Sequence, residues 1–144
     1  MVVQTKKIVT KLTNNIIDEN FVKEWLNSPK TGAICIFLGT ARDHHDGKKV
    51  LKLEYEGYTQ MALQEIEKIA LSMSKKWELE RIAIIHRLGV VPIQEASVIV
   101  GVSSVHREEA FLACKYGIDQ IKVDVPIWKK EYYEGGEHWV GSCC

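Results

Sequence analysis

The sequence predicts a single α+β domain in which a mixed, mainly antiparallel sheet carries about three helices. Three stretches place apolar residues at the spacing of one helix face, and β-type stretches follow one another without a helix between them. The 144 residues, 46% of them hydrophobic and 26% charged, suffice for one core but not for two. We therefore expect one domain over residues 1–140 and a flexible tail at residues 141–144.

The first predicted elements are a strand and a helix. Residues 8–12 alternate apolar and polar side chains, which predicts a short strand. Asp18 can cap the N-terminus of the helix that follows, and Pro29 and Gly32 lie beyond its end. The apolar side chains of this helix are Phe21, Val22, Trp25 and Leu26.

Two further predicted strands flank a polar loop. Residues Gly32–Gly39 form an apolar β-type run, and Val50–Glu56 alternates Leu51, Leu53 and Tyr55 with charged residues. The loop between them, residues 40–49, is too polar for the core. Because a strand holds it on each side, it is a typical place for binding residues.

The second half of the chain predicts two longer helices and more strands. A helix is expected over Thr59–Trp77, followed by neighbouring strands at Glu80–Leu88 and Ala96–Ser104. The next helix runs from His106 to about Ile121, and Pro126–Glu131 is extended. The core faces of these two helices comprise Ala62, Ile66, Ile69, Ala70, Met73 and Trp77, and Ala110, Phe111, Cys114, Gly117, Ile118 and Ile121.

Charge and composition exclude several classes of protein. Nineteen Lys and Arg residues balance nineteen Asp and Glu residues, so we expect neither nucleic acid nor a membrane surface as partner. The N-terminal residues lack the apolar stretch of a signal peptide, which predicts a cytosolic protein. Four cysteines without a CxxC pair predict no disulfide framework and no zinc motif.

A first candidate site lies where a strand meets a helix. Ser103, Ser104, His106 and Arg107 occupy this junction, and a helix N-terminus with two cationic side chains favours an anion such as phosphate. The alternative is that Ser104 caps the helix and the cations are solvated.

A second candidate site contains two lysines that flank an apolar stretch. Lys122 lies at the end of the last helix, and Lys129 follows Pro126. In a partly buried pocket a lysine can donate a proton or stabilise negative charge, although a lysine at a helix C-terminus is also common for dipole reasons alone.

Arg42, His44 and His45 form a third cationic group, on the polar loop. Adjacent histidines rarely bind one metal with good geometry, so we expect no metal. His86 lies within an apolar strand, which favours a structural, hydrogen-bonded role. The sequence contains no GxSxG, Walker or dinucleotide-binding motif, which argues against the corresponding hydrolases, NTPases and dehydrogenases.

Five motifs together resemble one family. They are FLGTARDH (37–44), LEYEGY (53–58), IHRLG (85–89), SSVHR (103–107) and IKVDVPIWKKE (121–131). In this order, and over a span from about Ile34 to Trp139, they resemble the large, catalytic subunit of molybdopterin synthase, more the animal members than the bacterial ones.

The resemblance implies a fold of the α/β-hammerhead type and a sulfur transfer reaction. Cyclic pyranopterin monophosphate would become molybdopterin, with both sulfurs delivered on the thiocarboxylated C-terminal glycine of a small ubiquitin-like subunit. The large subunits would form a homodimer within a heterotetramer, with the pterin pocket near the dimer interface and no cofactor of their own. The implied substrate-binding residues are Thr40, Ala41, Arg42, His106, Arg107, Lys122, Lys129, Lys130 and Glu131, with Lys122 and Lys129 as the catalytic ones.

This assignment explains the three cationic groups. The substrate's phosphate would draw Arg42, His106 and Arg107 together, and a lysine ammonium would stabilise or protonate the negative charge that develops during sulfur transfer. Asp124 departs from the neutral or basic residue expected there, and would hold Lys122 protonated if it faced that lysine.

Two other functions remain open from the sequence. One is a non-catalytic scaffold that binds the tail of a ubiquitin-like protein, and the other is a general phosphate-binding module, which would not need the lysines. No cysteine is expected to carry sulfur: Cys35 and Cys114 are predicted to be buried, and Cys143 and Cys144 lie in the predicted tail.

Overall fold

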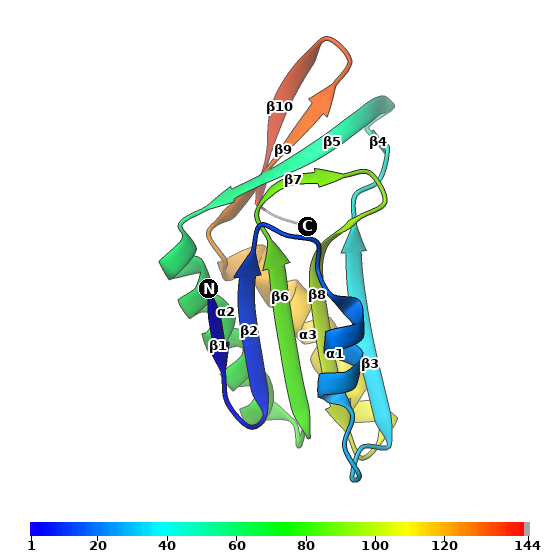
Figure 1. Cartoon of the computed structure of the whole chain (residues 1–144), viewed down its shortest axis with the longest axis vertical. Coiled ribbons are helices and arrows are strands. Elements are labelled where there is room, and N and C mark those ends of the chain that lie inside the picture. Colours follow the sequence, from blue (N-terminus) through cyan, green and yellow to red (C-terminus); the bar gives the residue numbers. More distant parts are fainter. Residues whose placement is uncertain (143–144) are drawn as a thin grey trace.

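The computed structural model describes residues 1–142, which form two sheets and three helices (Figure 1). The larger sheet stands upright in the view, and the smaller one crosses its upper end. This arrangement confirms the predicted α+β class with its mixed, mainly antiparallel strands.

The larger sheet has five strands, and parallel pairing occurs between two of them, β2 and β6. Antiparallel pairs complete it, and β3 lies at one edge, hydrogen-bonded to β8 alone within residues 1–142. In spatial order the strands are β1 (Val2–Gln4), β2 (Ile8–Thr13), β6 (Arg81–Arg87), β8 (Ala96–Ser104) and β3 (Ala33–Thr40).

The smaller sheet is antiparallel and is built around the long strand β5, which contacts β4, β7 and β9. Its strands are β4 (His44–His45), β5 (Lys48–Gly57), β7 (Gly89–Pro92), β9 (Ile127–Tyr133) and β10 (Gly136–Ser142). Strands β6 and β7 are joined at Leu88, so the chain passes directly from one sheet to the other.

Three helices cover the larger sheet. Helix α1 (Glu19–Leu26) is capped by Asp18, whose side chain accepts a hydrogen bond from the backbone N–H of Phe21 at 3.0 Å. Helices α2 (Thr59–Lys76) and α3 (Arg107–Asp124) pack on the opposite face from α1. The predicted Asp18 cap is confirmed, and so are the predicted core faces, except that Phe21 is 39% and Phe111 64% exposed.

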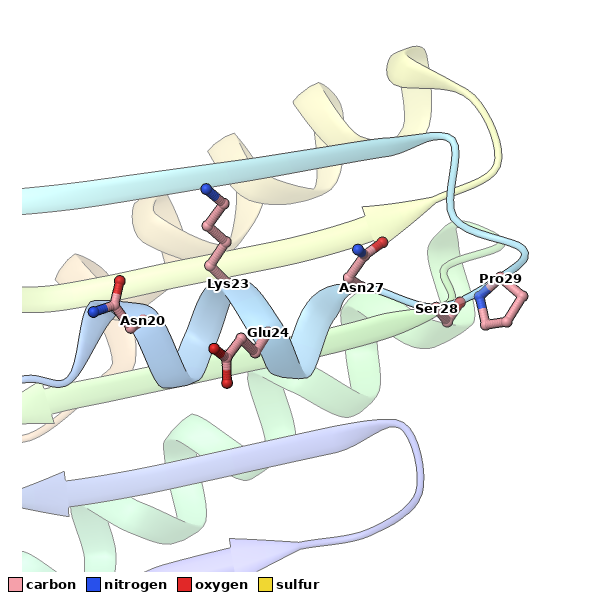
Figure 2. A pocket seen from close by; sticks show the side chains of 6 residues that line it. All are labelled: Asn20, Lys23, Glu24, Asn27, Ser28 and Pro29. Atoms are coloured by element: carbon pink, nitrogen blue, oxygen red, sulfur yellow. The ribbon is translucent and has the colours of Figure 1, made fainter.

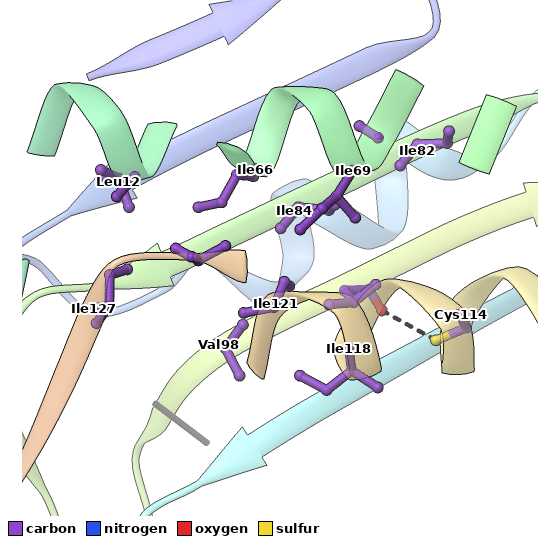
Figure 3. Close-up of a cluster of buried hydrophobic side chains, with 14 of the residues drawn as sticks. Leu12, Ile66, Ile69, Ile82, Ile84, Val98, Cys114, Ile118, Ile121 and Ile127 are labelled. Atoms are coloured by element: carbon purple, nitrogen blue, oxygen red, sulfur yellow. Dashed lines mark hydrogen bonds between the residues drawn. The ribbon is translucent and has the colours of Figure 1, made fainter. Parts of the chain in front are cut away.

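The main core lies between the larger sheet and the helix pair α2 and α3 (Figure 3). At its centre, a Cβ added to Gly117 of α3 would lie 3.0 Å from Val100 of β8 and 3.1 Å from the sulfur of Met73 of α2. The absence of a side chain at Gly117 therefore lets α3 approach both neighbours closely.

Several local predictions were incomplete or wrong. Strands β1, β4, β7 and β10 were not predicted. Strand β10 includes residues 141 and 142, which were expected to belong to the flexible tail. Strand β2 is buried on both faces, including Thr10. In β5 the pairing register shifts between Val50 and Lys52, so Val50 and Leu53 both face the core while Leu51 is 48% exposed. This bulge breaks the simple alternation that the sequence suggested.

Candidate active site

A cavity of about 370 Å³ lies where the two sheets meet. Its walls come from the end of β3, the start of β8, strands β5 and β9, and the last turn of α3. The lining residues are Phe37, Leu38, Gly39, Thr40, Arg42, Leu53, Tyr55, Ser97, Lys122, Lys129 and Glu131.

The fold brings Lys122 and Lys129 together through a sharp change of direction. Helix α3 ends at Asp124, Val125 caps it through its backbone N–H to Ile121, and Pro126 opens the segment into β9. The residue before a proline is disfavoured in helical conformation, which explains why the helix stops at this point. The chain then returns past the end of the helix, so lysines from both elements line one cavity.

Within the cavity, three cationic side chains face one carboxylate. Arg42, Lys122 and Lys129 supply the positive charges and Glu131 the negative one, so the lining carries an excess of positive charge. Lys129 is mostly withdrawn from water, with a side chain 16% exposed, and its Nζ lies 3.8 Å from Glu131 Oε2. Such a cavity is suited to an anionic ligand, because its net positive charge attracts an anion and the partly buried Lys129 interacts with one more strongly than an exposed cation does.

Glu131 is buried and lies at the centre of a hydrogen-bond network. The Tyr133 hydroxyl donates to Oε1, and His45 Nδ1 lies 2.8 Å from the same oxygen. Burial raises the pKa of the Glu131 carboxyl, but the hydrogen bonds from Tyr133 and His45 and the charges of His45 and Lys129 together hold that pKa below its ordinary value. The same contact raises the pKa of Tyr133 to about 12, so the phenol remains a donor.

The predicted site residues divide into three groups by position. Thr40, Arg42, Lys122, Lys129 and Glu131 line the cavity. Ala41 is buried in the core instead, where its backbone bonds to the segment between β7 and β8. Lys130 lies on the other face of β9, with its ammonium 4.6 Å from the Trp139 ring centre.

His106 and Arg107 form the third group and lie far from the cavity. Strands β3 and β8 are antiparallel, with Ala33 opposite Ser104 and Thr40 opposite Ala96. The eight residues of β3 span roughly 24 Å at about 3.4 Å per residue. The expected convergence of these two residues with Arg42 therefore does not occur within one chain.

The local structure around His106 also differs from the prediction. His106 is the N-cap residue of α3 but makes no side-chain cap, and the Ser104 hydroxyl donates to the His106 carbonyl. At the other end of α3, Asp124 forms no ion pair with Lys122 within the described residues. The idea that Asp124 holds Lys122 protonated thus has no contact to support it.

A larger hollow of about 670 Å³ lies along the outer side of α1 (Figure 2). The polar side chains of Asn20, Lys23, Glu24 and Asn27 project into solvent there, followed by Ser28 and Pro29. One exposed lysine beside one exposed glutamate creates no concentrated charge, so size alone does not make this hollow the site.

The histidine within β6 has a structural role. His86 is fully buried, with Nδ1 2.8 Å from the Arg87 carbonyl oxygen and its ring against Tyr55. This confirms the structural role that was predicted.

Within residues 1–142, no group of three His, Cys, Asp or Glu residues is arranged to hold a metal ion, and no helix is long and apolar enough to cross a membrane.

The two described cysteines differ in burial. Cys114 is buried as predicted, whereas Cys35 is only half-buried. Burial, and to a smaller extent neighbouring Cys35, raise the pKa of the Cys114 thiol to about 12, which leaves almost no thiolate at neutral pH. Cys143 and Cys144 lie outside the described residues.

The sequence did not reveal the supporting residues of the site. Tyr133 could have been found, because the period of two in a strand places residues 129, 131 and 133 on one face of β9. The Asp46-Gly47 dipeptide, with positive φ angles of 50° and 77°, is a hairpin signal that could have predicted β4 and the position of His45.

Comparison with known proteins assigns the family. The family model described as MoaE protein matches residues 12–124, which include most of the cavity lining. The chain belongs to the MoaE family. It is similar to the curated molybdopterin synthase catalytic subunits of Homo sapiens, with 45% identity over 96% of this chain and 74% of the human protein, and of Bos taurus, with 48% identity over 91% and 69%.

Solved structures of similar proteins have the same fold. Molybdopterin synthase from Staphylococcus aureus superposes with a TM-score of 0.88 at 34% identity, covering 96% of this chain and 99% of that one. A chain from a complex of subunits 1 and 2 of the molybdopterin-converting factor of Helicobacter pylori superposes with a TM-score of 0.76. At 20% identity, that second match speaks to the fold alone.

Proposed function

We propose that the chain is the catalytic subunit of a molybdopterin synthase, which converts cyclic pyranopterin monophosphate into molybdopterin. The observation that carries the proposal is the cavity in which Arg42, Lys122 and Lys129 converge, in a chain of the MoaE family. The cyclic phosphate of the substrate and the thiocarboxylate of the sulfur donor are both anions. A cavity with excess positive charge suits both.

The chemistry of the two lysines suits the proposed reaction. Attack of a thiocarboxylate on the pterin side chain develops negative charge, and an ammonium beside the reacting atoms can stabilise that charge or donate a proton. Lys129 is the more withdrawn from water, so its charge interacts through a lower effective dielectric than that of exposed Lys122. Arg42, on the rim formed by the β3 end, is suited to hold the phosphate.

The sulfur donor in this proposal is the C-terminal tail of a small ubiquitin-like subunit. The lining residues Arg42 and Lys122 are exposed, so the cavity reaches solvent and a narrow chain end can enter it.

A homodimer would explain the position of His106 and Arg107. Strand β3 is an edge strand that exposes Ile34, Phe37 and Leu38, as an interface strand does. If two copies pack along β3 about a two-fold axis, the Ala33 end of one copy lies beside the Thr40 end of the other. His106 and Arg107 of one copy would then approach the cavity of its neighbour and add positive charge for the phosphate.

The experiment that tests the proposal is a reconstituted reaction. Purified chain, cyclic pyranopterin monophosphate and a thiocarboxylated small subunit are mixed, and molybdopterin formation is followed by mass spectrometry. A chain that binds the small subunit but forms no sulfur-containing pterin would instead support the scaffold function. Binding of the pterin phosphate without binding of the small subunit would support the phosphate-binding module.

A further inference from the structure

His45 and Glu131 make an unexpected contact between the loop hairpin and the site. His45 lies on β4, which pairs with the start of β5, and its ring reaches the buried carboxylate of Glu131 on β9. An ionised carboxylate can only accept hydrogen bonds, so His45 Nδ1 carries the proton in this contact. On the other side of the ring, Nε2 lies 3.5 Å from Asp46 Oδ2.

Glu131 stands between this histidine and the lysine in the cavity. Its Oε1 receives the donors from His45 and Tyr133, whereas its Oε2 faces Lys129 Nζ at 3.8 Å, beyond hydrogen-bond distance. The hydrogen bonds from His45 and Tyr133 thus offset much of the negative charge on Oε1. Lys129 lies near the carboxylate without a hydrogen bond to it, so its N–H donors remain available to a ligand.

We propose that His45 is a positioning residue, which sets the orientation and charge of Glu131 and thereby holds the Lys129 ammonium in place for reaction. This inference rests on the proposed function, because it treats Lys129 as the group that faces the reacting atoms. Without the His45 donor, the carboxylate turns its charge towards Lys129 and draws the ammonium away from the substrate.

Several other charged or titratable groups lie around the contact. Lys48 is the cross-strand neighbour of His45, with its Nζ 5.2 Å from the Tyr133 ring centre, and Arg42 and Lys122 line the same cavity as Glu131. Asp46 faces the far side of the His45 ring, Tyr133 and Lys129 face Glu131 from β9, and His138 on β10 is the cross-strand neighbour of Glu131. The tests must therefore separate the effect of His45 from a general change in this region.

His44 offers the matched control. It is the other residue of β4, but its side chain is 72% exposed and contacts Asp43 rather than the cavity. We expect His45→Phe to lower kcat by at least about fivefold with KM within about twofold, and His44→Phe to change neither. His45→Asn, whose side-chain N–H can take nearly the position of the Nδ1–H, should recover part of the lost kcat.

A double-mutant cycle distinguishes positioning from a structural effect. In a Glu131→Gln background, His45→Phe should change kcat by less than about twofold, because the charged group through which His45 acts is gone. If His45→Phe costs the same factor in both backgrounds, or nothing in the wild-type background, the proposal is refuted.

A readout without activity keeps this inference separable from the proposed function. Carbon-13 NMR can follow the Glu131 carboxyl carbon and the Lys129 ε-carbon in the free chain. In His45→Phe the pKa of Glu131 should rise and the Lys129 signal should move, and in His44→Phe both should stay unchanged. An unchanged Lys129 signal in His45→Phe would overturn the proposal even if the chain transfers sulfur. If the Glu131 and Lys129 signals of His45→Phe move but the wild-type chain transfers no sulfur, only the proposed function is overturned.

Discussion

Removal of the Lys129 ammonium is the most direct perturbation of the proposed reaction. At about 4 Å and an effective dielectric of about 20, a unit charge interacts with developing negative charge by roughly 4 kcal/mol. Loss of one positioned donor typically costs about 2.7–4 kcal/mol of transition-state stabilisation, or about 10²–10³ in rate. We therefore expect Lys129→Ala to lower kcat by about 10²-fold or more, and Lys122→Ala to have an effect of similar size.

The fold should tolerate this change. Lys129 Nζ is 3.8 Å from Glu131 Oε2, and the carboxylate keeps its donors from Tyr133 and His45 after the lysine is removed. We expect unfolding free energy to fall by no more than about 1–2 kcal/mol, as for a pair without a hydrogen bond.

The assay is single-turnover molybdopterin formation with saturating thiocarboxylated small subunit, beside a urea unfolding curve for each variant. Lys130→Ala is the informative comparison, because Lys130 lies on the other face of β9 over Trp139 and should therefore cost far less rate than Lys129. Near-normal rates in both Lys122→Ala and Lys129→Ala, or equal losses in Lys129→Ala and Lys130→Ala, would refute the reasoning.

Four further outcomes are expected. Arg107→Ala should weaken binding of the pterin precursor and leave kcat nearly unchanged, as measured by calorimetry and kinetics, because a distant phosphate contact acts equally on ground and transition states; unchanged affinity would remove Arg107 from the site. Glu131 has a folded-state pKa below its unfolded value, so its contribution to stability is present above about pH 4.5 and is lost as pH falls through the folded pKa. The stability difference between wild type and Glu131→Gln in urea should accordingly shrink from pH 7 to pH 3, and a constant difference would contradict the network. Light scattering at micromolar concentration should give the mass of a dimer, and Phe37→Lys should shift it towards one chain, since it places a charge on the edge strand. A variant with all four cysteines changed to Ala or Ser should transfer sulfur within about tenfold of wild type, and a folded variant that binds both substrates without transfer would make a cysteine the carrier.

Local pattern determined much of this protein. Helical spacing of apolar residues located α2 and α3, the Asp18 cap located the start of α1, and Ile- and Val-rich runs located β3, β6 and β8. These features depend on contacts within one helical turn or on burial of one face of a helix or strand. Both can be inferred from residues that are close together in the sequence. Strands β1, β4 and β7 were missed because strands of two to four residues exist only through the partner that pairs with them. Strand β10 is longer, but its sequence GEHWVGS lacks the Ile- and Val-rich composition that marked β3, β6 and β8.

The site was readable from sequence only in part. The five motifs contain Thr40, Arg42, Lys122, Lys129 and Glu131, and the cavity brings these five together. The convergence of Lys122 with Lys129 and Glu131 depends on the turn from α3 into β9, and Pro126 marks that turn in the sequence.

Only the tertiary structure decided which remaining groups belong to one cavity. Antiparallel pairing of β3 with β8 carries His106 and Arg107 to the far end of the sheet, although both follow the same strand that begins at the cavity. The contact of His45 with Glu131 joins residues 86 positions apart, through strands that a local pattern does not pair. The chemistry of each side chain can be read from the sequence. Distances between side chains are set by strand order and direction, which depend on how the whole chain buries its apolar residues.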